Sequence, residues 1–285
     1  MKRLDRRALF ASGAAAALLA ATGTSLAQQP RRGGTLRLAV PRDGGLLERV
    51  ARGAVYDQLT EVAPDGLLRG ELATGWHSDD SARRWIVKLR QDVSFHDGLN
   101  LRASDVIASL EVHASRGDLR LEGLRALTLK DDDAVEFVLD EGNPHLPYRL
   151  ADTGLVIAAD GDVQASLATM TGTGLYAVER AQDGRHFRAR RREQHYKDGS
   201  AGWFDALDLI VISDAAVRAE ALRDGFVDVA SLPTPEGLRG RGSFNYHPSE
   251  GDMALAAGQH IVMPRRISNR GSLDDHRITE RWWMA

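Results

Sequence analysis

Residue types that could carry out chemistry are numerous in this sequence, but they form no familiar catalytic pattern. The chain has nine His, 40 Asp and Glu residues and no Cys. The absence of Cys excludes a Cys nucleophile, a thiolate metal site and a disulfide. The G-x-S-x-G and H-E-x-x-H patterns are missing, and no pair of His residues has the spacing of metal ligands. We therefore predict that the protein is not an enzyme and binds no metal or cofactor.

Two local arrangements resemble functional sites and are better explained as turns. His96 stands beside Asp97, but Gly98 follows, and Asp followed by a Gly that can adopt positive φ is typical of a turn. The run Asp131-Asp132-Asp133 suggests calcium, but a calcium loop needs spaced oxygen ligands and a bidentate Glu further on. A solvated hairpin turn between extended segments at 126–130 and 134–139 is the preferred interpretation.

Two further stretches could bind phosphate. Thr171-Gly172-Thr173-Gly174 is Gly-rich, but no Lys-Ser/Thr follows it, and a strand pattern comes next in place of a helix. The basic stretch 185–192 could contact nucleic acid, but Phe187 and Ala189 alternate with Arg residues, as on a strand with one solvated face. The formal net charge of −3 becomes −6 without residues 1–27, which carry four basic residues and one acidic residue. Nucleic acid is therefore not predicted as a partner.

The first residues have the pattern of an export signal. Four basic residues precede a run of small and apolar residues at 8–21, and Ser25-Leu26-Ala27 fits a signal-peptidase site. Residues 5–10 resemble a twin-arginine signal. A retained membrane anchor is the alternative, but the run is shorter than the roughly 20 residues that span a bilayer. We predict cleavage after Ala27 and a periplasmic protein that is not embedded in the membrane; lipid attachment is excluded because no Cys follows.

The remaining elements alternate between strands and helices. Trp85, Val87 and Leu89 alternate with polar residues, as in a strand with one buried face. Helical spacing predicts helices at 46–59, 105–115 and 214–224, the second capped by Ser104 or Asp105 and the third by Asp214. Strands are expected at 34–40 and 207–212, and turns at 77–81 and 96–98. A strand, helix and strand from 207 onward predict a parallel crossover.

The stretch 72–110 contains, in order, L-A-x-x-W, a short acidic turn, W-x-V-K-L-R, x-V-x-F-H-D-G and A-x-D-V. In this order it resembles the signature region of the extracytoplasmic solute-binding proteins that serve peptide, oligopeptide and nickel ABC importers. Segments at 56–60, 171–176 and 273–278 resemble other parts of the family. Leu175 replaces the usual Pro in the second of these segments.

The resemblance implies an α/β fold: a periplasmic-binding-protein-like lobe with a mixed sheet flanked by helices. It implies a first lobe at 28–235, a thinly matched segment at 236–285, and no second lobe. In the family the loop after the first strand approaches the cleft. Arg42 and Asp43 are therefore candidate ligand-binding residues, although a solvated turn explains them equally well. Tyr56 is the third candidate.

The implied function is non-catalytic capture of a peptide or similar small solute, in a truncated form, for the membrane subunits of an ABC importer. The alternative is a periplasmic interaction or sensing module that has lost solute capture. Trp282-Trp283 would be unusual as solvent-exposed residues, so we expect them either to fold back onto the core or to contact a partner.

Overall fold

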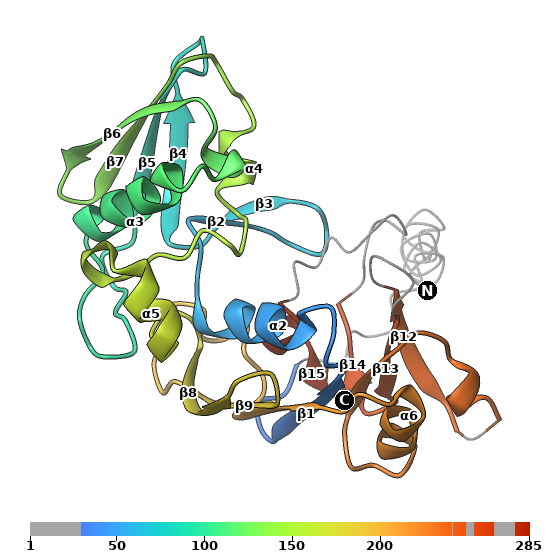
Figure 1. The fold of residues 1–285 in the computed structure, drawn as a ribbon. Coiled ribbons are helices and arrows are strands. Elements are labelled where there is room, and N and C mark those ends of the chain that lie inside the picture. Colours follow the sequence, from blue (N-terminus) through green and yellow to red (C-terminus); the bar gives the residue numbers. More distant parts are fainter. Residues whose placement is uncertain (1–29, 241, 249–253, 265–276) are drawn as a thin grey trace, which may run out of the picture.

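The computed structural model describes residues 30–240, 242–248, 254–264 and 277–285. A seven-stranded sheet forms one end of the molecule and a four-stranded sheet the other, with helix α2 (Leu46–Val55) between them (Figure 1). The predicted signal segment and its cleavage site lie outside the described residues.

The larger sheet is mixed, as predicted. Its strand order is β12-β13-β11-β1-β10-β9-β8. Strand β1 lies parallel to β10 on one side and to β11 on the other, while the outer pairs are antiparallel. The bounds are β1 (Thr35–Val40), β8 (Tyr176–Gln182), β9 (His186–Arg191), β10 (Ala206–Val211), β11 (Val229–Leu232), β12 (Phe244–Pro248) and β13 (Ala254–Gly258).

Two helices cover different parts of this sheet on opposite faces. The apolar side of α2 packs on Leu207 and Leu209 of β10, in one core cluster with alternate residues of β1. Helix α6 (Ala215–Arg223) packs on Ala39 of β1 and Ala230 of β11, which point to the other face. Asp214 caps α6, and β10, α6 and β11 form the predicted parallel connection with β1 between the two strands.

The four-stranded sheet has the order β4-β5-β7-β6 and packs against helix α3 (Figure 1). Its strands are antiparallel, and Asp131–Asp133 form the hairpin between β6 and β7. The remaining elements of this part and the connections are β2 (Thr60–Val62), β3 (Leu68–Gly70), β4 (Ala73–Ser78), β5 (Arg84–Leu89), α3 (Ala103–Ser115), β6 (Leu124–Asp131), β7 (Ala134–Leu139), α4 (Leu146–Arg149) and α5 (Val163–Thr169).

Three predicted boundaries were wrong. Helix α2 ends at Val55, four residues before its predicted end, because Tyr56 is extended and its hydroxyl donates to the Ser166 carbonyl at 2.7 Å. Strand β4 includes His77 and Ser78, which pair with β5, so the turn there is shorter than predicted. Helix α3 begins at Ala103, because Arg102 is its N-cap residue and Asp105 instead accepts a bond from the Arg102 backbone N–H at 2.8 Å.

The last described segment folds back onto the core. Trp282 is fully buried in the cluster formed by α2 and the larger sheet. It lies between helix α7 (Ile278–Arg281) and strand β15 (Trp283–Met284), which pairs with β14 (Ile261–Val262). Of the two roles expected for the tryptophans, Trp282 therefore has the first, which is packing back onto the core.

Candidate functional site

The three parallel strands end at one edge of the larger sheet, which we call the carboxyl edge. Strand β1 ends at Val40, β10 at Val211 and β11 at Leu232. In open α/β sheets ligands bind outside the carboxyl ends of the strands, because the loops that follow diverge there. Arg42 and Asp43 lie in the loop after β1, so the structure places both of these predicted residues at this edge.

Arg42 lines a hollow of about 500 Å³ beside the carboxyl edge. We call it the arginine hollow; its main lining residues are Arg42, Arg180, Arg185, His186, Ile210 and Val211. Asp43 is exposed and does not line it. The sequence pattern did not single out Arg180 or Arg185, because the basic stretch from 185 onward fits one solvated face of a strand.

Tyr56 lies apart from the other two candidates. Its side chain is 1% exposed, and it borders a separate hollow of about 270 Å³ together with Met170 and Phe187. Burial raises the pKa of its hydroxyl, which donates to the Ser166 carbonyl. The structure thus brings Arg42, but not Tyr56, to the arginine hollow, and Tyr56 packs as a core residue whose edge faces the smaller hollow.

A second concentration of charge is buried between the two sheets. We call it the ionic cluster; it consists of Asp57, Glu61, Glu71, Lys197, Arg277, Glu280 and Arg281. The Lys197 ammonium is at its centre. It donates to Asp57 at 2.7 Å, to Glu280 at 3.0 Å, and to Glu71.

Arg277 and Arg281 complete the ionic cluster from the C-terminal side. The fully buried Arg277 guanidinium donates to Glu71 and to the Gln58 side chain. Arg281 donates to Glu61 at 3.2 Å. The cluster therefore joins the end of α2, the β2–β3 region, the loop around 197 and α7. The ionic cluster could not be predicted from the sequence, because its members are far apart in the chain.

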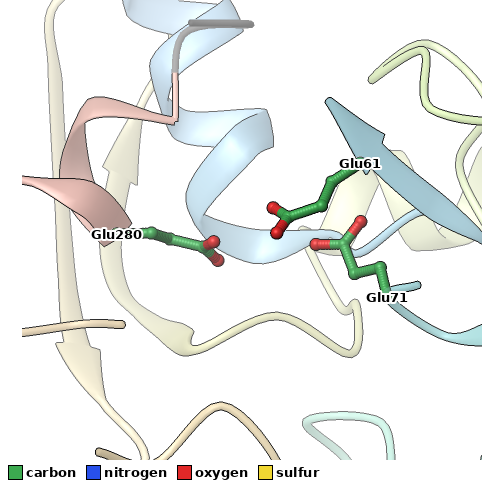
Figure 2. A group of neighbouring side chains, drawn as sticks. All are labelled: Glu61, Glu71 and Glu280. Carbon is green, nitrogen blue, oxygen red and sulfur yellow. The ribbon is translucent and has the colours of Figure 1, made fainter. Parts of the chain in front are cut away.

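Three carboxylates of the ionic cluster have the proximity of metal ligands. Oxygens of Glu61, Glu71 and Glu280 lie within 4.8 Å of one another, and the side chains point toward a common centre from β2, the β3–β4 connection and α7 (Figure 2). The Lys197 ammonium already donates to two of the three, Glu71 and Glu280, and thus supplies the cation that such a group needs. We interpret the trio as part of an ion-pair network and not as a metal centre.

Burial and charge shift the pKa values in the ionic cluster in opposite directions. Burial raises the pKa of Glu71 to about 8 despite the neighbouring Arg277 and Lys197. Burial alone would raise the pKa of Asp57, but Lys197 and His195 hold it well below its ordinary value. Burial alone would lower the pKa of Lys197, but the carboxylates raise it. The neighbouring charges thus keep Asp57 and Lys197 ionised, whereas burial works against the charge of Glu71.

The fold and the parallel-strand edge define this chain as a periplasmic-binding-protein-like α/β protein. Residues 68–248 match the family of bacterial extracellular solute-binding proteins, family 5 middle region. The chain belongs to this family, which confirms the resemblance found in the stretch 72–110. A family of solute-binding proteins also supports the prediction that the chain is not an enzyme.

Two curated relatives are similar over nearly two thirds of this chain. One is the probable peptide ABC transporter periplasmic-binding protein y4tO of Sinorhizobium fredii, 25% identical over 63% of this chain and 38% of its own length. The other is the probable D,D-dipeptide-binding periplasmic protein DdpA of Escherichia coli, 26% identical over 64% of this chain and 38% of its own. The chain thus spans well under half the length of these relatives.

Solved structures show the same fold. The periplasmic binding protein MoaA of A. tumefacien R10, solved with mannopinic acid, superimposes with a TM-score of 0.67 at 20% identity, over 76% of this chain and 49% of its own. Within the described residues, the helices are too short or too polar to cross a membrane.

Proposed function

We propose that the protein is an exported, non-catalytic solute-binding component of an ABC importer, and that it binds a peptide or similar small solute at the carboxyl edge. The observation that carries this proposal is the family match over residues 68–248, on a fold that leaves the carboxyl ends of three parallel strands together. The arginine hollow at that edge has a volume within the range of small-molecule pockets, roughly 300–1,000 Å³.

The predicted export signal and the family support a periplasmic location, with cleavage after Ala27. Importer membrane subunits are the proposed partners, while the acidic net charge argues against nucleic acid. The solutes named for the relatives are a peptide, a D,D-dipeptide and mannopinic acid. They define the first group of compounds to test with this chain.

A thermal-shift screen of the protein purified after export tests the proposal. The compounds are dipeptides to pentapeptides, D,D-dipeptides, nickel chelates, sugars and mannopinic acid. A solute at about a hundred times its dissociation constant adds roughly 2.7 kcal/mol to the free energy of unfolding. We expect a saturable rise in melting temperature with at least one compound. A cooperative melt that no compound shifts would contradict solute capture and favour the alternative, a module that binds protein partners.

A further inference from the structure

Among the described residues, no helix covers strands β8, β9 and β10 on the face of the larger sheet opposite α2. Helix α2 covers β8, β9 and β10 on one face, and α6 covers β1, β11 and β13 on the other. Asp208 and Ile210 of β10 alternate with the buried Leu207 and Leu209, so they point away from α2, and Ile210 is 41% exposed. The β8–β10 part of the face opposite α2 is therefore accessible, and the arginine hollow lies on it.

A β-bulge brings Arg180 to this accessible face. The register between β8 and β9 shifts between Val178 and Arg180, so that Arg180 pairs with Arg188, which in turn pairs with Asp208. Without the extra residue Arg180 would lie opposite Phe187, on the buried face under α2. Bulges of this kind redirect a side chain at a sheet edge. The local backbone thus exposes a third arginine beside Arg42 and Arg185.

The hairpin end that carries Arg185 is fixed to the carboxyl edge. The Val211 backbone N–H donates to the Arg185 carbonyl at 2.9 Å, and the Arg185 N–H donates to the Gln182 carbonyl at 2.9 Å. Arg185 and Val211, which this hydrogen bond joins, both line the arginine hollow, where Ile210 and Val211 supply an apolar surface. The position of the Arg185 backbone is therefore set by β10, the strand next to β1.

The described part of the chain does not neutralise the charges in the arginine hollow. Among the described residues, the guanidinium groups of Arg42, Arg180 and Arg185 have no hydrogen-bond or ion-pair partner. Asp43 and Asp183, which stand close to Arg42 and Arg185 in the chain, form no ion pair with them, and two acidic groups on the accessible face are engaged by other residues. Glu179 accepts from Arg188 at 3.0 Å and from Arg190 at 2.5 Å, and Asp208 accepts from His186 at 2.7 Å and from Arg188 at 3.1 Å.

We propose that the arginine hollow binds a small solute carrying at least two anionic oxygen-bearing groups, carboxylate or phosphate. Arg42, Arg180 and Arg185 hold these groups, because a guanidinium presents paired N–H donors that match either group. Ile210 and Val211 contact the apolar part of the solute. This inference rests on the proposed function and names the class of solute.

Isothermal titration calorimetry at constant ionic strength, which measures the dissociation constant of each probe, tests the inference. Citrate is the carboxylate probe and inorganic phosphate the phosphate probe. Glucose and a cationic dipeptide serve as comparators. We expect one or both anions to bind saturably, and the comparison of citrate with phosphate identifies the preferred group. The change Arg180→Met should weaken anion binding about tenfold, and Arg180→Met with Arg185→Met should abolish it. The control Arg125→Met removes an exposed strand arginine of β6 and should leave affinity unchanged.

Three results would overturn the inference. If a comparator binds saturably while neither anion does, the solute class is wrong although solute capture stands. If an anion binds equally well to the double variant, the arginine hollow is not its site. If no probe of any charge binds, both the inference and the proposed capture at this edge fail. Melting temperatures of the variants, measured in parallel, show whether each remains folded.

Discussion

The ionic cluster and the arginine hollow are both rich in charged side chains. These charges are buried and paired in the ionic cluster, whereas in the arginine hollow they are exposed and have no partner among the described residues. In the ionic cluster the Lys197 ammonium faces Asp57, Glu71 and Glu280, with the three carboxylates almost inaccessible to solvent. In the arginine hollow the described residues provide no carboxylate partner for three exposed arginines. Buried charges must be paired because desolvation is costly, whereas exposed ones need not be. The cluster therefore has a structural role, and the hollow has charge available for a ligand.

Replacing the central cation of the ionic cluster should have the largest effect. Lys197→Met preserves the length of the side chain but leaves buried carboxylates without their ammonium. We expect the free energy of unfolding to fall by about 3–5 kcal/mol, the usual loss when one partner of a buried pair is removed. Urea denaturation followed by circular dichroism measures it.

Lys88→Met is the matched control for this change. The Lys88 Nζ atom lies 3.5 Å from the Asp133 carboxylate, and the Lys88 side chain is 64% exposed. Its replacement should therefore lower the free energy of unfolding by less than about 1 kcal/mol. Equal losses in the two variants would mean that burial does not distinguish the charges of the ionic cluster from surface charges.

The pH dependence of the free energy of unfolding tests the effect of burial on a single group of the ionic cluster, the Glu71 carboxyl group. Glu71 has a pKa of about 8 in the folded protein and an ordinary value of 4.5. Between these values the folded state holds a proton that the unfolded state has lost, so this group makes stability fall as pH rises, by at most about 1.4 kcal/mol per pH unit. Glu71→Gln cannot titrate and should remove that part of the slope.

The difference between wild type and Glu71→Gln isolates this effect. Burial lowers the pKa of His96 and His113, which gives both proteins an opposite slope near and below pH 6.5. Asp57 has a lowered pKa and is ionised in both states across the window. These contributions cancel in the difference, which urea unfolding at several pH values from 5 to 8 measures. A difference that stays constant with pH would show that Glu71 is already ionised at pH 5.

Local patterns were enough to predict most elements of the fold. Alternation predicted β5 almost to the residue, and Asp214 correctly marked the start of α6. The errors occur where distant partners decide the backbone conformation. Helical spacing extended α2 beyond Val55, but the Gln58 N–H donates to Glu71 at 2.7 Å and holds the chain extended there.

The sites depend more heavily on distant contacts. Arg42 could be predicted from the family resemblance, because the loop after the first strand approaches the cleft in the family. The Arg277–Gln58 bond joins residues 219 positions apart, and no local pattern contains such information. Arg180 faces the solvent only because of a single bulge in β8, and the plain alternation of the sequence does not reveal that shift.

The smallest effect should come from the paired charges on the accessible face. Arg188 is 39% exposed and contacts Glu179 at 3.0 Å and Asp208 at 3.1 Å. Since solvent screens these pairs, Arg188→Met should lower the free energy of unfolding by less than about 1 kcal/mol. Urea unfolding at low salt and at about 1 M salt, where the screening length is about 3 Å, should show this loss vanishing while that of Lys197→Met persists. A loss for Arg188→Met above about 2 kcal/mol that survives high salt would mean that the ion pairs on the accessible face stabilise the fold as the buried ones do, and the distinction between the two regions would fail.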